Sequence, residues 1–268
     1  MDLKIFDVEH GACALLTCDD NTRLMIDCGQ NAATGWTPGG YLRRLGISYL
    51  DMLAITNYDE DHVDGLPDLR NSVDIGWLWR NKKVSSQHIR YLKSEDGMGA
   101  GIDTLVDMID FEFTGTASST ARPSFLGLKS TSFSNSPTIF GDENNLSMAL
   151  HLSCYGIGVL FPGDLEGPGW LRLLEDPSFR DALSKTQVLI ASHHGRESGI
   201  CEEVFEFCHP YFIAISDKGY MYDTQLTIPF YRSKALGAQF RQAFRRVLTT
   251  RGDGRIGFRF SPTGWWPY

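Results

Sequence analysis

Short apolar segments alternate with polar positions along most of the chain, and they predict a protein of strands and helices. Alternation and β-branched residues indicate strands in the first part of the sequence. These strands are expected at residues 3–8, 12–17, 23–27 and 52–56. Between the last two, Tyr41, Leu42 and Leu45 share one helical face, so a helix is predicted from Gly39 until Gly46 ends it.

Regular patterning weakens in the middle of the chain and then returns. Residues 88–92 and 102–109 predict helices, whereas residues 114–135 are rich in Ser, Thr and Gly and predict a long loop or a hairpin. Further along, strands and one helix are predicted again. The strands are expected at residues 146–152, 156–161, 188–191 and 211–215, and the helix at 169–174.

Four of the predicted strands end in a polar group. These groups are Asp59, Asp61 and His62 after the fourth strand, then Asp164, then His193 and His194, and finally Ser216 and Asp217. In α/β folds, the carboxyl ends of neighbouring strands meet at one edge of the sheet and usually carry the chemistry. We therefore expect these side chains to converge.

The first group is the densest. Asn57, Asp59 and Asp61 alternate directly after an apolar strand, and His62 follows. Such a concentration of charge is costly beside a strand unless a divalent cation compensates it, although a solvated acidic loop is the alternative. Asp61 and His62 combine with Asp164 and with one of the two adjacent histidines. This nitrogen and oxygen set suits zinc, manganese or iron, with a metal-activated water as nucleophile.

Composition is that of a soluble globular protein. The chain has 268 residues, of which 42% are hydrophobic and 22% charged. It contains no apolar run of roughly 18 residues, which excludes a membrane-spanning helix and a membrane partner. The N-terminus lacks the pattern of a signal peptide, so a cytoplasmic location is expected. One domain over residues 1–268 is predicted, with a variable insertion at about residues 73–135.

The charge is uneven. The formal net charge of −8 argues against binding of long nucleic acid over the whole surface. A local arginine-rich stretch occupies residues 241–259, however, and it favours either an anionic substrate or a solvated helix face and hairpin edge. The six cysteines form no Cys-x-x-Cys pair and are expected to be buried and reduced, with Cys28 left open because it follows Asp27.

The order of these motifs resembles the metallo-β-lactamase superfamily, most closely the branch found in bacterial competence DNA-uptake proteins. Residues 57–62 (NYDEDH) are similar to the family's His-x-His-x-Asp-His, and Gly163-Asp164 and His193-His194-Gly195 are similar to its bridging aspartate and its His-His-Gly. Residues 6–11, 25–29, 144–147 and 248–254 resemble further motifs of that branch, whereas residues 73–135 match none of them. The resemblance implies an α/β fold, a four-layer αββα sandwich of two packed sheets with outer helices.

The departures from the family pattern concern the first of two metal sites. Asn57 and Asp59 stand where the family has histidines, and Ala12 stands where its opening motif has an aspartate. The resemblance implies an intact second site, suited to zinc, with the ligands Asp61, His62, Asp164 and His194. An oxygen-rich first site with Asn57, Asp59, Asp164 and Asn144 would favour manganese or magnesium, or would stay empty.

Other roles follow from the same resemblance. Asp61 and His193 are the candidate catalytic residues. His194 is the expected metal ligand of the pair, and His193 is expected either to support a ligand from behind or to donate a proton to the leaving group. Candidate substrate-binding residues are Arg251 or Arg255 for a phosphate, and Tyr222 and Asp223 in a loop near the substrate. Asp27 and Asp217 are expected to support the ligands, and His10, His88, His151 and His209 to be structural or exposed.

The predicted function is that of a metal-dependent hydrolase acting on a phosphodiester. The substrate would be an anionic small molecule or a short nucleic acid, such as a nucleotide or an oligonucleotide, and a protein partner is left open. The alternative is a catalytically degenerate module of the same fold that binds a partner or nucleotide with an incomplete metal site. Residues 73–135 are expected to cap the site and set its specificity.

Overall fold

Two mixed β-sheets form the centre of the structure, a computed structural model that describes residues 1–95, 97–114, 122–219 and 223–268. The first sheet has the strand order β17-β16-β1-β2-β3-β5-β7. Its strands are β1 (Asp2–Ile5), β2 (Cys13–Thr17), β3 (Arg23–Cys28), β5 (Met52–Ala54), β7 (Leu78–Trp79), β16 (Ile256–Ser261) and β17 (Gly264–Pro267). β3, β5 and β7 run parallel, and the other neighbours in this sheet are antiparallel.

The second sheet has the order β15-β12-β11-β10-β9-β8. Its strands are β8 (Leu128–Ser134), β9 (Met148–Cys154), β10 (Ile157–Phe161), β11 (Thr186–Ile190), β12 (Phe212–Ile215) and β15 (Val247–Thr249). β10, β11, β12 and β15 are parallel, so their carboxyl ends lie at one edge. Two small ribbons pair β4 (Tyr49–Leu50) with β6 (Asp74–Ile75) and β13 (Ala238–Phe240) with β14 (Ala243–Arg245).

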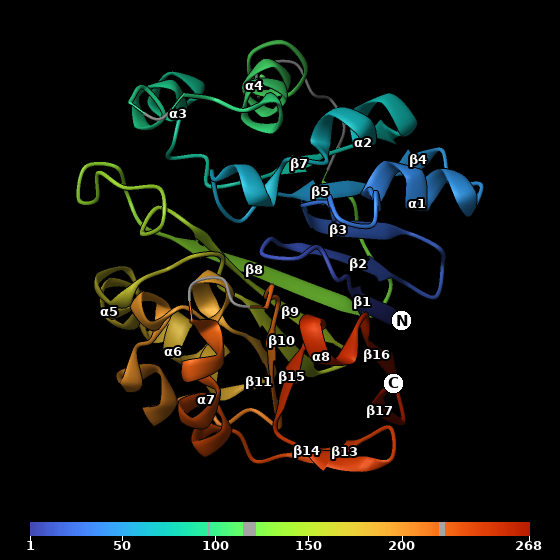
Figure 1. The fold of residues 1–268 in the computed structure, drawn as a ribbon, viewed down its shortest axis with the longest axis vertical. Coiled ribbons are helices and arrows are strands. Elements are labelled where there is room, and N and C mark those ends of the chain that lie inside the picture. Colours follow the sequence, from blue (N-terminus) through green and yellow to red (C-terminus); the bar gives the residue numbers. More distant parts are fainter. Residues whose placement is uncertain (96, 115–121, 220–222) are drawn as a thin grey trace.

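The helices cover the outer faces of the two sheets. On the first sheet lie α1 (Pro38–Arg44), α2 (Leu66–Ser72), α3 (Ser86–Leu92) and α4 (Ala100–Asp107), which continues as a π-helical turn (Met108–Glu112). On the second sheet lie α5 (Gly167–Leu174), α6 (Pro177–Ser184) and α7 (Ile228–Lys234). Figure 1 shows the two helical layers on opposite sides of the sheets, with α8 (Thr250–Asp253) following β15.

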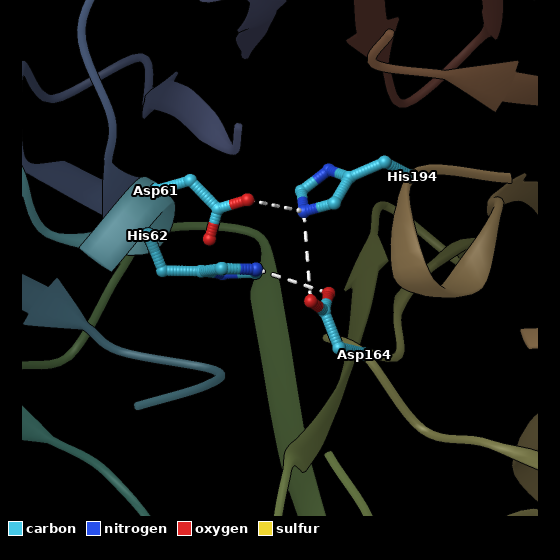
Figure 2. A group of neighbouring side chains, drawn as sticks. All are labelled: Asp61, His62, Asp164 and His194. Carbon is cyan, nitrogen blue, oxygen red and sulfur yellow. Dashed lines mark hydrogen bonds and ion pairs between the residues drawn. The ribbon is translucent and has the colours of Figure 1, made fainter. Parts of the chain in front are cut away.

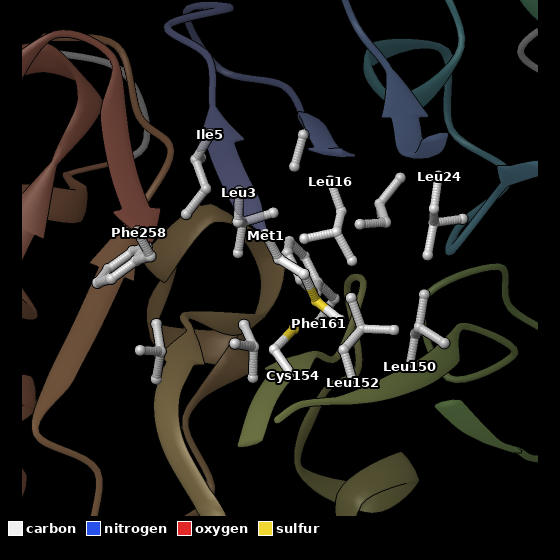
Figure 3. Close-up of a cluster of buried hydrophobic side chains, with 14 of the residues drawn as sticks. Met1, Leu3, Ile5, Leu16, Leu24, Leu150, Leu152, Cys154, Phe161 and Phe258 are labelled. Atoms are coloured by element: carbon white, nitrogen blue, oxygen red, sulfur yellow. The ribbon is translucent and has the colours of Figure 1, made fainter. Parts of the chain in front are cut away.

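Three clusters of buried apolar side chains separate the four layers. The middle cluster lies between the sheets, where Leu16 and Leu24 face Leu150 and Leu152 (Figure 3). Because successive side chains of a strand point to opposite faces, Leu15 next to Leu16 packs in a second cluster against the helices. A third cluster lies between the second sheet and its helices. The predicted four-layer αββα sandwich is therefore confirmed.

The structure corrects the prediction for residues 114–135. Residues 128–134 form β8, an edge strand that pairs antiparallel with β9 along its whole length. Only Phe133 of β8 is buried, because the strand lies at the sheet edge, and this weak alternation gave no strand signal in the sequence. Helices α2, α6 and α7 were also not predicted, and each is only seven or eight residues long.

Helices α3 and α4 of the segment 73–135 belong to the helical layer over the first sheet, whereas β8 of the same segment belongs to the second sheet. Ile89 of α3 and Ile102 and Leu105 of α4 are nearly inaccessible to solvent and share a cluster with residues of α1 and α2. The segment therefore contributes to the core as well as reaching toward the site. Its role in specificity stays a prediction.

All six cysteine side chains are buried, as expected, and none forms a disulfide. No helix within the described ranges is long and apolar enough to cross a membrane.

Candidate metal centre

Four side chains from three different loops converge between the sheets. Asp61 and His62 lie in a 3-10 turn (Glu60–His62) after β5, Asp164 follows β10, and His194 lies in a second such turn (Ser192–Gly195) after β11. One ligand atom from each residue lies within 4.8 Å of the others, and Figure 2 shows the four side chains pointing toward one another. The structure thus brings together the four residues predicted as the second metal site.

Asp164 connects the two histidines of this group. Its Oδ1 lies 3.0 Å from Nε2 of His62, and its Oδ2 lies 3.5 Å from Nε2 of His194 (Figure 2). Nε2 of His194 also lies 3.4 Å from Oδ2 of Asp61. The two imidazoles and two carboxylates therefore enclose one small volume.

The donor set fits a divalent cation. Nε2 of His194 is buried, and within the described part of the chain it has no hydrogen-bond partner, although two carboxylate oxygens face it. A buried polar atom without a hydrogen bond is costly, and a cation shared by these nitrogens and oxygens would satisfy it. Two imidazoles with two carboxylates suit zinc, manganese or iron.

Asp27 holds His62 in a fixed orientation. Oδ2 of Asp27 lies 3.0 Å from Nδ1 of His62, so the other ring nitrogen faces the site. The carboxylate accepts hydrogen bonds from the backbone N–H (2.7 Å) and the hydroxyl (2.5 Å) of Thr56. Burial alone would lower the pKa of His62, but the Asp164 and Asp27 carboxylates outweigh burial and raise this pKa well above its usual range.

Asp164 is fixed from behind by Ser147. The Ser147 hydroxyl oxygen accepts a hydrogen bond from the backbone N–H of Asp164 at 3.0 Å. Burial tends to raise the pKa of Asp164, but the His62 and His194 imidazoles together hold it well below its usual value. Asp164 is therefore ionised, and it can accept hydrogen bonds or ligate a cation.

The two adjacent histidines share a strained turn. Both His193 and His194 have left-handed backbone conformations, with φ angles of 51° and 53°. The turn is anchored to the loop after β10, because the backbone N–H of His193 donates to the Gly163 carbonyl and the Ser192 hydroxyl donates to the Leu165 carbonyl. These contacts hold the backbone of the turn against the loop after β10.

His193 adjoins the group of four without joining it. Its Nε2 lies 4.0 Å from Oδ2 of Asp164, whereas its Nδ1 lies 3.1 Å from the Ser198 hydroxyl and 3.3 Å from Oε1 of Glu166. Burial lowers the pKa of His193. Its assignment as proton donor stays a prediction.

Two glycines allow the close approach of the loops to Asp61. A Cβ atom at Gly11 or at Gly29 would lie 2.6 Å from the backbone oxygen of Asp61. The same oxygen accepts a hydrogen bond from the N–H of Ala12 at 3.2 Å. Glycine at both positions therefore lets the first strands fix the backbone that carries Asp61.

Asn57 and Asp59 are each bound by other side chains of the protein. The amide nitrogen of Asn57 donates to the Ser147 hydroxyl at 2.9 Å, and its oxygen accepts from the N–H of Asp59 at 2.7 Å. The Asp59 carboxylate forms an ion pair with the ammonium of Lys93. Both predicted ligands of the first site thus have protein partners, and their assignment as ligands stays a prediction.

Of the predicted substrate-binding residues, Arg251 and Asp223 have protein partners of their own, and the role of all four stays a prediction. The guanidinium of Arg251 lies 3.1 Å from Oδ2 of the buried Asp217, and Arg255 lines a cavity of about 250 Å³ beside Phe6 and Trp36. Asp223 is exposed and accepts a hydrogen bond from Gln225, outside the group of four. Tyr222 lies outside the described residues.

Sequence reasoning missed His10 and Arg196 as neighbours of the site. The ring of His10 packs on that of His194 with 4.5 Å between centroids, and its Nε2 lies 2.9 Å from Nη2 of Arg196. His10 was expected to be structural or exposed, and no sequence motif placed it beside His194. Arg196 follows the His193-His194-Gly195 motif directly, which is the one signal that could have placed it.

No protein-family profile and no curated protein sequence matches the chain. Among solved structures, the chain is similar to YhfI of Bacillus subtilis, a metallo-β-lactamase fold protein, at 12% identity over 100% of both chains with a TM-score of 0.48. It is also similar to a proposed metal-dependent hydrolase of Parabacteroides distasonis, at 13% identity over 92% of both chains with a TM-score of 0.48. A diphosphatase of the PhnP family is similar at 10% identity over 96% of this chain and 97% of that one, with a TM-score of 0.47. Since identities and TM-scores are this low, the chemistry is argued from the chain's own residues.

Proposed function

We propose that the protein is a metal-dependent hydrolase of the metallo-β-lactamase type that cleaves a phosphodiester. The observation that carries the proposal is the enclosed group of Asp61, His62, Asp164 and His194, in which Nε2 of His194 is buried and faces two carboxylates without a hydrogen bond. A cation shared by these atoms would offset the cost of burying His62, Asp164 and His194 together. The Asp27–His62 contact further supports ligation, because a carboxylate behind the imidazole is the usual support of a metal-ligating histidine.

A divalent ion bound by this group would supply Lewis acidity and make water a better nucleophile at neutral pH. The chain's own residues would orient the reaction. Asp61 is the open side of the group, since its side chain is 32% exposed whereas those of His62, Asp164 and His194 are at most 4% exposed. Substrate would therefore enter beside Asp61, and His193 would hold or transfer a proton next to Asp164.

The phosphodiester preference rests on charge near the site and on the motif resemblance to the competence-protein branch. The guanidinium of Arg196 is held by His10, whose ring packs on His194, so a cationic group borders the proposed centre. A planar guanidinium suits a phosphate group because it can donate two parallel hydrogen bonds. The net charge of −8 favours a nucleotide, an oligonucleotide or another small anion over long duplex DNA.

The test is metal content and hydrolysis in matched variants. The purified protein is loaded with zinc or manganese, and metal is counted by plasma mass spectrometry in the wild type, His62→Ala and Asp59→Ala. We expect about one metal per chain in the wild type and in Asp59→Ala, and loss of metal in His62→Ala, because only His62 belongs to the group of four. The exposed His209→Ala serves as the matched control and is expected to keep the metal.

A hydrolysis assay with different ester substrates tests the phosphodiester preference separately from metal binding. Bis(p-nitrophenyl) phosphate is expected to be cleaved by the loaded wild type. His62→Ala is expected to lose at least about 100-fold of this rate, because loss of a residue that only supports a ligand already costs roughly 10–100-fold. A loaded protein that cleaves only monoesters or carboxylic esters would overturn the diester assignment while leaving the metal centre in place. A protein that binds neither metal would instead favour the degenerate binding module.

A further inference from the structure

Lys93 places a buried ammonium group beside the proposed metal centre. Lys93 follows α3, is 8% exposed, and its ammonium contacts the carboxylates of Asp59 and Glu143, the latter at 2.8 Å. Burial tends to lower the pKa of Lys93, but these two carboxylates outweigh burial and raise it. The ammonium is therefore shared by two carboxylates.

The position of this cation is connected to the group of four by short steps. Asp59 lies two residues before Asp61 on the same loop, and its N–H is bound by the side chain of Asn57. The other end of Asn57 donates to Ser147, and the Ser147 hydroxyl also accepts the N–H of Asp164. A series of contacts through Asp59, Asn57 and Ser147 therefore links the Lys93 ammonium to Asp164 of the proposed metal centre.

Oxygen atoms that a second divalent ion could use are gathered around Lys93. They are the carboxylates of Asp59 and Glu143 and, nearby, the amide oxygen of Asn144, which lies 3.5 Å from the amide nitrogen of Asn57. Such an oxygen-rich set suits manganese or magnesium. The Lys93 ammonium already neutralises part of the charge of the two carboxylates. A divalent ion at this position would have to displace the buried ammonium of Lys93.

We propose that the Lys93 ammonium takes the place of the metal ion of the first site, the site predicted around Asn57 and Asp59. The centre then binds a single divalent cation, held by the group of four. The inference rests on the proposed metal centre but does not depend on the identity of the substrate. Lys93 acts here as a positioning residue, since its ammonium binds the carboxylates of Asp59 and Glu143 where the metal ion of the first site would bind them. Its removal would leave two half-buried carboxylates without a counter-ion and open that position to a metal.

The experiment is a count of bound manganese by plasma mass spectrometry, together with calorimetric titration of the metal-free protein with Mn²⁺. The wild type is expected to bind about one ion per chain, and Lys93→Met about two, with the added ion weaker than the first. Lys185→Met is the matched control, because Lys185 also pairs with a carboxylate, Asp181, but on the exposed surface of the other helical layer. The control is expected to bind one ion.

A double variant and a charge-conserving variant complete the test. Lys93→Met combined with Asp59→Asn is expected to return to one ion, and Lys93→Arg to keep one ion because the cation is retained. Should Lys93→Met fail to fold, Asp59→Asn in the wild-type chain decides the matter: it is expected to keep one ion with an affinity within about threefold of the wild type.

The contradicting outcomes separate this inference from the proposed function. Two ions in the wild type, one ion of unchanged affinity in folded Lys93→Met, or loss of the metal in Asp59→Asn would each overturn the role of Lys93 while leaving a metal centre. A wild-type protein without metal would overturn the metal centre itself, and this inference with it.

Discussion

At the scale of single residues, the site depends on positions where side-chain size or backbone conformation leaves little choice. Gly29 lies so close to the loop of Asp61 that an added Cβ would meet backbone oxygens of Asp61 and Ala12 at 2.6 and 2.9 Å. His193 and His194 both adopt left-handed conformations that cost free energy and are kept by contacts to the loop after β10. Strain and close contact of this kind are typical of functional loops.

Gly29→Ala is expected to displace the backbone of Asp61 and so to affect both stability and metal binding. Overpacking against backbone atoms that cannot move should lower the free energy of unfolding by about 1–3 kcal/mol. Metal affinity should fall by at least tenfold, because Asp61 is one of the four proposed ligands. Urea denaturation and metal titration measure the two effects.

Gly141→Ala is the matched control for this change, because a Cβ there meets no atom within 4 Å. Equal stability and equal metal affinity in the two alanine variants would mean that the Asp61 loop adapts to the added methyl group, and would refute the tight-packing argument.

At the scale of elements, loops that are distant in sequence complete one another's hydrogen bonds. Helix α5 begins after Glu166, whose side chain makes no capping hydrogen bond. Its first turn is instead capped by Asn145 from the loop before β9, whose side-chain oxygen accepts from the N–H groups of Gly169 (2.8 Å) and Glu166 (3.3 Å). This contact ties the loop that carries Ser147 to the loop that carries Asp164, in addition to the hydrogen bond between these two residues.

Asn145→Ala is expected to lower the free energy of unfolding by about 1–2 kcal/mol, the usual cost of losing a capping side chain. The backbone N–H groups at the start of α5 would lose their acceptor. Urea denaturation checks this value against Asn71→Ala, which removes an exposed asparagine of α2 and is expected to be nearly neutral. If Asn145→Ala lowers the free energy of unfolding no more than Asn71→Ala does, water replaces the Asn145 side chain as acceptor for the first turn of α5.

At the scale of the whole molecule, buried ionisable groups make stability depend on pH. His151 of β9 lies 7% exposed in the helix-facing side of the second sheet, against Gly158. Burial, together with the nearby Lys185 ammonium, lowers the pKa of His151 from 6.5 to about 4. Its Nε2 has no hydrogen-bond partner among the described residues, so the folded chain holds this imidazole neutral.

The pH dependence follows from this shift. Between pH 6.5 and about 4 the unfolded chain binds a proton on His151 that the folded chain does not, so acidification through this window removes stability. The loss attributable to His151 on going from pH 7 to pH 4.5 is roughly 2–3 kcal/mol, at about 1.4 kcal/mol per unit of pKa.

His151→Gln is therefore expected to lose less stability than the wild type over the same interval. Chemical denaturation at pH 7 and pH 4.5 measures the difference, and the exposed His209→Gln is expected to behave as the wild type. Parallel losses in wild type and His151→Gln would show that His151 can be protonated in the folded protein.

Much of the fold was predictable from the sequence because local patterns encode it. Alternation predicted most strands of both sheets, and polar residues at strand ends indicated where loops would meet. Parallel strands carry their carboxyl ends to one edge, so Asp164 after β10 and His194 after β11 had to be neighbours. β8 was missed because an edge strand with mostly polar positions lacks the signal of a buried one.

By itself, the sequence determined the presence of strands and helices and the strand ends that carry Asp61, His62, Asp164 and His194, because both follow from short-range periodicity. The four-layer architecture was expected only from the resemblance of the motifs to a known family. Only the tertiary structure decided what surrounds these four side chains. The Lys93–Asp59 contact spans 34 residues and the Arg196–His10 contact spans 186, so no local pattern encodes either pair. Whether Asp59 faces a metal or an ammonium depends on where α3 packs, and packing is settled by the core as a whole.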